Sequence, residues 1–355
     1  MPFDYFDTHT LLAAVEQIAP TSNFLRDRYF PTSDGDIFTT NKVLVEYRDG
    51  SRMAAPFVVP RKGGVLLERD GYSVSEYEPP TIAPKRMLTV DTLKRKGFGE
   101  AIMSNLTPAQ REQMILVKDM DELGESISIR EEAMAAEVMQ TNGCVMKHIA
   151  DNKTVGDTME IRYYSESQNP AKYTPTGNWE TSYDGILKDL GVMVRTLTSR
   201  GLPATELVVG ADVADAILNN TAIQKLLDIR NFDLGRVNPA LLPDGASRIA
   251  VLNVKGRIID VICYEEQYVD YEDGKTKSFI DPKSVVLTAP AAGRTAYGAV
   301  TQLEQADNEF HTYGGKRVPK FVSNADRNTR EIIVTARPIL MPKAKNAFVT
   351  AKVLA

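Results

Sequence analysis

The chain has 355 residues, of which 43% are hydrophobic and 25% are charged, values close to globular averages that predict a substantial buried core. Its formal net charge of -5 argues against a general nucleic-acid-binding protein, because such proteins usually carry a strong basic excess. The two cysteines, Cys144 and Cys263, form no CxxC pair, so neither a disulfide framework nor a zinc site is expected.

The N-terminal part of the chain is acidic and contains neither a basic region nor a long apolar run. We therefore expect no secretory signal and no membrane span, and folding in the cytoplasm of the producing cell. Residues 23–31 place aromatic and basic side chains together without a helical or strand period. This segment is either an extended arm that binds a partner surface or a local cap over the chain's own core, and the sequence favours neither.

The next part of the chain predicts a long two-stranded excursion. Residues 42–48 alternate as a strand does, and Asp49-Gly50 indicates a turn. Residues 56–84 contain repeated proline and glycine breaks around two further strand-like stretches, 65–69 and 72–77. Because an isolated hairpin is only marginally stable in water, we expect this excursion to lie on another surface, such as a neighbouring subunit.

The clearest predicted element is a long helix. Thr107, Pro108 and Gln110 form a capping box with proline at the first helical position, and Asn142-Gly143 is a stop signal. Between them runs one apolar stripe: Leu116, Met120, Leu123, Ile127, Met134 and Val138. The opposite face is expected to be charged through Glu112, Lys118, Glu122, Glu125 and Glu132. A helix of about 34 residues is roughly 50 Å long, which favours a strut across the molecule over a coiled-coil or bundle helix.

After a predicted strand at 159–164 and a polar loop with Trp179, helices and strands alternate from residue 184 onward. Asp184 and Asp212 are expected to cap two helices, and Asp273-Gly274 is typical of a hairpin turn. The pattern predicts a compact α/β domain followed by a β-rich end, with strands at 206–209, 249–254, 258–264, 284–288, 330–336 and 348–354.

Motifs for catalysis or cofactor binding are weak throughout. Gly274-Lys275-Thr276 resembles the end of a phosphate-binding loop, but Val269 stands where that motif needs a glycine. Residues 208–212 imitate a dinucleotide-binding turn with only one of its glycines. No metal-ligand spacing relates the three histidines, His9, His148 and His311. We therefore expect no catalytic residue, no cofactor and no metal.

The order of these elements resembles the major capsid proteins of tailed bacteriophages with the Hong Kong 97-like fold. Within that group the chain is most similar to the phage lambda major head protein family, also called major capsid protein E. The resemblance rests on residues 24–30, 38–43, 58–85, 267–275, 279–287, 302–307 and 348–355.

This resemblance implies an α+β capsid fold with four parts. They are an N-terminal arm and first strand at 1–49, an extended β-hairpin loop at 50–85, a peripheral domain at 86–184 and 299–355 whose spine helix is 107–142, and an axial α/β domain at 185–298. It implies a virion protein that self-assembles in the host cytoplasm, through hexamers and pentamers, into an icosahedral shell around double-stranded DNA that it does not read. Expected partners are further copies of the chain, a decoration protein, a portal and a scaffold, but no membrane.

Candidate inter-subunit contacts come from the arm and from the loop charges: Phe24, Leu25, Arg26, Tyr29, Arg61, Lys62, Glu68 and Arg69. Two alternatives remain. One is a host-encoded, encapsulin-like nanocompartment shell with the same fold. The other is a soluble α/β enzyme that uses residues 185–298 as its ligand domain.

Overall fold

The structure is a computed structural model that describes residues 23–40, 42–48, 72–94, 107–149, 155–163, 172–180, 185–220, 235–236, 240–243, 245–305 and 307–355. The predicted strand at 65–69 and the predicted cap Asp184 lie outside the described residues.

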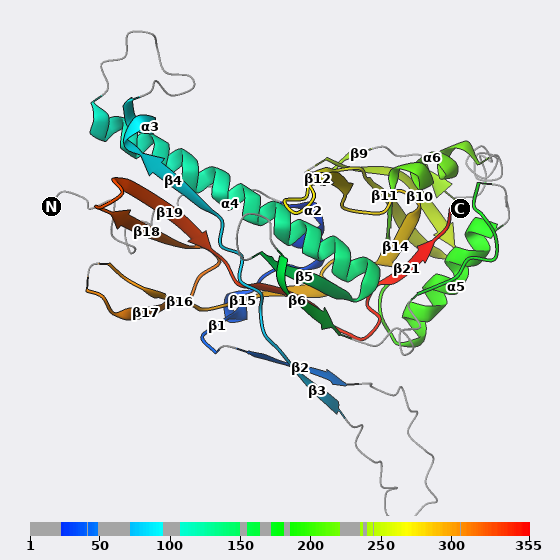
Figure 1. The fold of residues 1–355 in the computed structure, drawn as a ribbon. Helices are drawn as coiled ribbons and strands as arrows, with labels where there is room; N and C mark the ends of the chain where they lie inside the picture. Colours follow the sequence, from blue (N-terminus) through cyan, green and yellow to red (C-terminus); the bar gives the residue numbers. More distant parts are fainter. Residues whose placement is uncertain are drawn as a thin grey trace, which may run out of the picture.

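Helix α4 (Pro108–Thr141) runs from one end of the molecule to its middle, where it lies beside β5 (Gly143–Ile149) and β21 (Val349–Lys352) (Figure 1). The predicted capping box is confirmed, because the Gln110 N–H donates to the Thr107 hydroxyl at 3.3 Å while the Gln110 side chain accepts the Thr107 N–H at 2.9 Å. The helix ends at Asn142, whose φ of 56° is left-handed, a conformation that asparagine tolerates well. Within the described residues, no helix is long and apolar enough to cross a membrane.

All six residues of the predicted apolar stripe on α4 are buried. Four of them pack on the three-stranded sheet of β4 (Lys85–Thr89), β18 (Val318–Asn324) and β19 (Thr329–Thr335). The charged face was predicted wrongly at Glu132, whose side chain is buried. Beyond Ile127 most of α4 is enclosed, because α2 (Phe24–Tyr29), β5 (Gly143–Ile149) and β20 (Pro338–Pro342) pack around its C-terminal half.

A seven-stranded sheet forms the other end of the molecule (Figure 1). Helix α5 (Gly185–Ser199) packs on β10, β14 and β21, and α6 (Ala211–Asn219) packs on β11. The strand order is β21 (Val349–Lys352), β14 (Ser284–Thr288), β7 (Glu206–Val209), β11 (Arg257–Tyr264), β10 (Ala246–Val254) and β8 (Gly235–Arg236), and β9 (Ala240–Leu241) also pairs with β10.

Sheet membership does not follow the predicted division between 185–298 and 299–355. Strand β21 comes from the second range but pairs antiparallel with β14 of the first. Strand β15 (Gly293–Gly298) comes from the first range but pairs with β20 and with β1 (Ile37–Phe38). Alternation of apolar residues identifies a strand, yet it does not identify the partner of that strand.

Three of the remaining strand pairs are small sheets of their own. They are β2 (Val43–Arg48) with β3 (Tyr72–Tyr77), β5 with β6 (Val155–Arg162), and β16 (Val300–Leu303) with β17 (Phe310–Tyr313). The β2–β3 ribbon projects from the body of the molecule (Figure 1). The extended loop at 50–85 stays a prediction, because residues 49–71 lie outside the described residues.

The turn before α6 shows that the prediction of Asp212 as the helix cap was wrong. The N-cap of α6 is Gly210, and Asp212 lies in the first helical turn instead. A Cβ at position 210 would lie 2.4 Å from the carbonyl oxygen of Asp281, so the close approach of the two segments requires glycine there. The Val213 N–H donates to the Pro282 carbonyl at 3.3 Å. The Pro282 carbonyl therefore already accepts a hydrogen bond from one of the N–H groups at the start of α6, where a dinucleotide phosphate would bind.

The Gly274-Lys275-Thr276 sequence lies at a hairpin tip, as predicted. It joins β12 (Gln267–Val269) to β13 (Thr276–Ser278), and Gly274 has a φ of +65°. The carboxylate of Asp270 accepts hydrogen bonds from Lys277 at 2.5 Å and from Arg130 of α4 at 3.2 Å. This hairpin is thereby fixed to the long helix.

Candidate assembly surfaces

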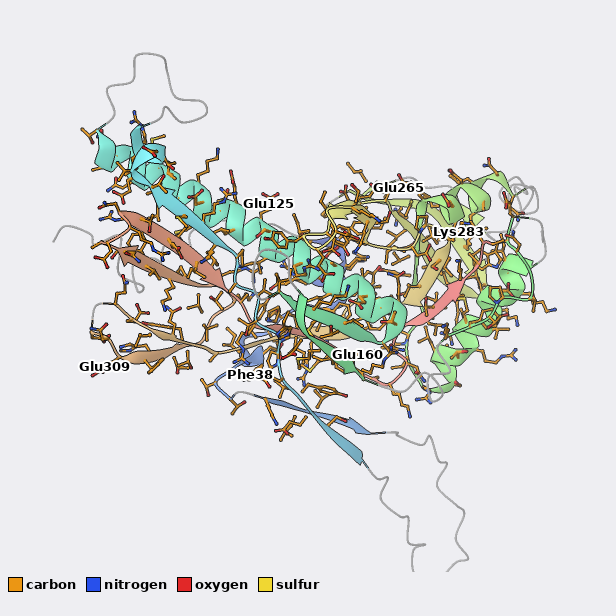
Figure 2. All side chains as sticks on the ribbon, viewed as in Figure 1. Phe38, Glu125, Glu160, Glu265, Lys283 and Glu309 are labelled. Atoms are coloured by element: carbon orange, nitrogen blue, oxygen red, sulfur yellow. The ribbon has the colours of Figure 1, made fainter. Side chains whose placement is uncertain are left out.

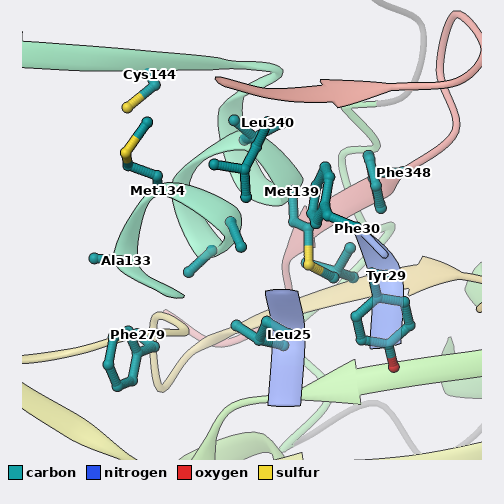
Figure 3. Packing of buried hydrophobic residues seen from close by; sticks show 14 of the residues in the cluster. Leu25, Tyr29, Phe30, Ala133, Met134, Met139, Cys144, Phe279, Leu340 and Phe348 are labelled. Carbon is teal, nitrogen blue, oxygen red and sulfur yellow. The ribbon is translucent and has the colours of Figure 1, made fainter. Parts of the chain in front are cut away.

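Helix α2 lies between α4 and the seven-stranded sheet, and three of the predicted contact residues are buried there. Phe24, Leu25 and Tyr29 are only 3%, 0% and 0% exposed. Figure 3 shows Leu25 and Tyr29 among the core side chains around Met139 and Phe348. In this conformation the segment is a local cap over the chain's own core, the second of the two alternatives. A role for these residues in contacts between subunits stays a prediction.

The N-terminus of α2 is held by a carboxylate from another element. Glu132 accepts hydrogen bonds from the Leu25 N–H at 2.7 Å, the Arg26 N–H at 2.9 Å and the Tyr264 hydroxyl at 2.9 Å. The first N–H groups of a helix have no partner within the helix, and a negative charge at that end is favourable. Burial raises the pKa of Glu132, although its three hydrogen bonds act in the opposite direction.

A second buried carboxylate of α4 joins α2 to a distant loop. Glu131 accepts hydrogen bonds from Arg26 at 2.7 Å and from both terminal nitrogens of Arg317 at 2.7 and 2.8 Å. The Arg317 guanidinium also donates to the Ser128 hydroxyl at 3.1 Å. Arg26, one of the predicted contact residues, is thus paired within its own chain.

The other side of α2 is attached to the seven-stranded sheet. Glu206, at the start of β7, accepts hydrogen bonds from Arg28 Nε at 2.7 Å and from the Tyr29 hydroxyl at 2.8 Å. Burial raises the pKa of Tyr29, which keeps this hydroxyl a donor. Three acidic residues, Glu131, Glu132 and Glu206, therefore hold one six-residue helix between the two halves of the molecule.

The predicted loop contacts Arg61, Lys62, Glu68 and Arg69 lie outside the described residues. Sequence reasoning missed a different class of candidate, the large apolar side chains that remain exposed. The most exposed are Leu241, Phe310, Ile258, Val269, Leu44 and Met114. Single exposed apolar residues are common, so each needs a second feature before it indicates a contact.

One hollow of the surface, which Leu44 helps to line, provides such a second feature because it combines apolar and charged residues. It has a volume of about 590 Å³ and lies between β1, the beginning of β2 and the β15–β20 pair. Its apolar lining includes Phe38, Val43, Leu44, Ala296 and Met341, and its charged lining includes Lys42, Glu76, Asp36 and Arg294. Lys42 pairs with Glu76 at 3.1 Å, and Arg294 lies 3.8 Å from Asp36.

Among the described residues, one group of possible metal ligands and the two thiols are candidate sites of chemistry. Asp307, Glu309 and His311 have ligand atoms within 4.8 Å of one another. However, His311 and Asp307 share a hydrogen bond of 2.7 Å, which raises the pKa of His311 without any ion. Burial raises the pKa of the Cys263 thiol to about 12 and also raises that of Cys144. Both thiols therefore stay protonated at neutral pH, and a protonated thiol is a poor nucleophile.

Two solved structures with a similar fold come from phages or prophages. A protein assigned as the capsid protein of a prophage in Escherichia coli CFT073 superposes with a TM-score of 0.67 at 18% identity, covering 99% of both chains. A subunit of the mature capsid of bacteriophage PhiM1 superposes with a TM-score of 0.50 at 8% identity, covering 93% of this chain and 87% of the other. The fold is that of the Hong Kong 97-like phage capsid proteins, as the sequence predicted.

The sequence identifies the family more narrowly. The chain belongs to the phage major capsid protein E family, whose model matches residues 7–353. A relative is the major capsid protein of Escherichia phage lambda, 23% identical over 353 residues that cover 98% of each protein. The resemblance drawn from the order of elements is thereby confirmed.

Proposed function

We propose that the chain forms the icosahedral head of a tailed phage through hexamers and pentamers, and that this head encloses double-stranded DNA. The observation that carries the proposal is the family match over residues 7–353. The three carboxylates that hold α2 between α4 and the sheet support it, because they make one rigid body of a subunit that must fit the same neighbours many times.

The charge of the chain is compatible with containing DNA without binding it tightly. Affinity for DNA comes largely from cations that neutralise phosphates, and this chain has 42 lysines and arginines against 47 aspartates and glutamates. Head-to-tail contacts between copies close into rings. Many weak contacts of this kind are sufficient for a stable shell.

The parts of the subunit then take separate roles. Helix α4 is the spine of a peripheral domain, and the β2–β3 ribbon is the root of an extended loop that lies over a neighbouring subunit. The seven-stranded sheet with α5 and α6 is the core of an axial domain, whose tips meet at hexamer and pentamer centres. Pairing of β21 with β14 and the hydrogen bond from Tyr173 N–H to Thr350 at 2.8 Å support including 172–180 and 349–352 in that domain.

The wider partners follow from the same proposal. Assembly takes place in the host cytoplasm, and the product is part of the virion. A scaffold, a portal and a decoration protein are the partners that a shell of this class uses. A nanocompartment shell of the same fold is less favoured, because the family match is to phage capsid proteins. Packaged DNA, rather than an enclosed enzyme, distinguishes the two.

The test is electron microscopy of the purified chain after size-exclusion chromatography, in negative stain. Closed particles, or sheets and tubes of hexamers, support the proposal. The same preparation should be repeated after co-expression with the neighbouring phage genes, which would supply a scaffold. A chain that stays monomeric under both conditions contradicts the proposal and directs attention to the ligand-domain alternative at 185–298.

A further inference from the structure

The β16–β17 hairpin carries an apolar pair at its outer end. Leu303 and Phe310 are direct cross-strand partners, and Phe310 is 76% exposed. Among the described residues, neither strand pairs with a third one. A two-stranded sheet is marginally stable in water, and an exposed phenylalanine gives up a large stabilising contact. The end of this hairpin therefore has the properties of a surface that another molecule covers.

The hairpin cannot fill the hollow beside its own base. Its first residues lie next to Phe38 of that hollow, because the Ala299 N–H donates to the Phe38 carbonyl at 2.8 Å. Strand β16 then runs outward for three residues to Leu303, about 10 Å at the rise of a strand. Figure 2 shows Phe38 at the base and Glu309 at the far end. Hydrogen bonds from Ser323 N–H to Gln305 at 2.9 Å and from Gln305 to the Ser323 carbonyl at 3.1 Å fix that end to β18.

The hollow and the hairpin end match in polarity. The hollow has an apolar lining that includes Phe38, Leu44 and Met341. Its volume of about 590 Å³ lies in the range of sites that enclose small molecules, and is therefore ample for an aromatic side chain. The hairpin end offers one such side chain, Phe310, next to the smaller Leu303.

The charges at the two surfaces are complementary. Glu309, an exposed carboxylate, directly precedes Phe310, while the exposed Asp307 pairs with His311. At the hollow, Arg294 is 45% exposed while its partner Asp36 is only 11% exposed, whereas Lys42 and its partner Glu76 are exposed alike, at 50% and 52%. An incoming carboxylate thus meets the Arg294 guanidinium before it meets Asp36. Ion pairs this exposed contribute little to stability, so their partners exchange at little cost.

From these observations we infer that Phe310 of one copy inserts into the Phe38–Leu44–Met341 hollow of a neighbouring copy. This inference rests on the proposed function, because it names one of the contacts from which the shell is built. Phe310 and the hollow lie on different surfaces of the same chain, so the contact is head-to-tail and continues from copy to copy. One aromatic side chain buries about 150–250 Å², far less than the 1,200–2,000 Å² of a stable pair. The contact therefore forms within a ring or shell and not in a free dimer.

Disulfide trapping tests the inference directly. Two differently tagged chains, one carrying Phe310→Cys and the other Leu44→Cys, are co-expressed, and the assembled fraction is oxidised. The native cysteines are buried and give a low background. A disulfide needs Cα atoms about 4.4–6.8 Å apart, so Thr40→Cys and Val43→Cys are tried as alternative partners. We expect a cross-linked dimer that contains both tags with at least one of the three partners, and no cross-link when Phe310→Cys is combined with the exposed Val117→Cys.

A second variant measures the importance of the contact. Phe310→Asp should raise the protein concentration needed for assembly at least about tenfold, since a buried phenylalanine contributes enough for that factor, whereas Phe310→Leu should change it less. Because Phe310 is exposed, both variants should keep the circular dichroism spectrum of the unmodified chain.

The outcomes separate the inference from the proposed function. Assemblies of the unmodified chain, with no mixed cross-link to any of the three positions and unchanged assembly of Phe310→Asp, would overturn the contact alone. Cross-links between two Phe310→Cys chains, in assemblies made of that variant alone, would place one hairpin end against another. This result would also overturn the inference. Failure of the unmodified chain to assemble under every condition would contradict the proposed function, and the contact with it.

Discussion

Replacing Glu132 by glutamine tests whether a distant carboxylate holds the N-terminus of α2. The glutamate accepts three hydrogen bonds through two oxygens, whereas glutamine has one oxygen and an amide that only donates. The best arrangement keeps the bonds from Leu25 and Tyr264 and turns the amide toward the Arg26 N–H, which loses its acceptor. A buried donor without a partner costs about 1–3 kcal/mol.

This cost should appear first as local opening of residues 24–29. Hydrogen exchange reports the free energy of such opening, and each 1.4 kcal/mol corresponds to a tenfold change. Amides of this segment should therefore exchange about 5- to 100-fold faster in Glu132→Gln than in the unmodified chain, measured by mass spectrometry on the unassembled subunit. The seven-stranded sheet should change little.

The control is Glu125→Gln, on the same helix but exposed (Figure 2). It removes the same charge from α4 without touching α2, so its exchange pattern should match that of the unmodified chain. Equal exchange of residues 24–29 in the unmodified chain and in Glu132→Gln would refute the reasoning.

Three further changes have defined outcomes. Asp189→Ala removes the acceptor for the Trp179 indole N–H at 2.9 Å and for two hydroxyls, so the free energy of unfolding in urea should fall by about 2–4 kcal/mol. Asp270 has a pKa of about 2, because hydrogen bonds from Lys277, Glu272 N–H and Arg130 outweigh the opposing effect of burial. Its folded-state pKa is below the unfolded value of 3.8, so it stabilises the fold above pH 3.8 by at most about 2 kcal/mol, and this contribution is lost as the pH falls toward 2. Asp270→Asn should therefore be less stable than the unmodified chain at pH 7 but nearly equal to it near pH 2. Reversing Arg61 and Arg69 together should block shell formation and leave the monomer folded.

Each of these outcomes has a matched control. Asp215→Ala removes an exposed carboxylate from the middle of α6 and should leave the unfolding curve nearly unchanged. Asp270→Asn would contradict the pH argument if its stability difference from the unmodified chain were the same at pH 7 and pH 2. For the loop, Arg195→Glu on the exposed side of α5 is the charge-reversal control, and normal shells from the Arg61 and Arg69 double variant would exclude the loop contact.

Local rules predicted the long helix well and failed where distant segments decide the environment. The capping box at Thr107, the left-handed end at Asn142 and the buried stripe all depend on residues a few positions apart. Glu132 has the sequence context of a charged outer face, yet it is buried, because α2 approaches from more than 100 residues earlier in the chain. No local pattern signals that approach.

The same limit explains why residues 23–31 were ambiguous in the sequence. Asn23 is a residue type that often begins a helix, yet its side chain makes no cap hydrogen bond to α2, so the local interaction that usually fixes a helix start is not formed. Its first N–H groups donate to Glu132 on α4. The side chains of Arg28 and Tyr29 donate to Glu206 on β7. A helix of six residues has little stability of its own, and here tertiary contacts supply what the sequence does not encode locally.

These contacts distinguish a part of the subunit whose polar groups are satisfied within one chain from parts that leave apolar side chains exposed. The segment joined by Glu131, Glu132 and Glu206 is satisfied within one chain, which gives the subunit a fixed shape before it meets a neighbour. The β2–β3 ribbon and the outer end of β16–β17 are two-stranded and carry exposed apolar side chains, Leu44 and Phe310. The proposed contacts with further copies would cover these exposed side chains, and would therefore stabilise the two pairs more than they stabilise the core. Assembly should therefore order these elements selectively, and the strength of the shell then depends on surfaces that contribute little to the folding of the isolated chain.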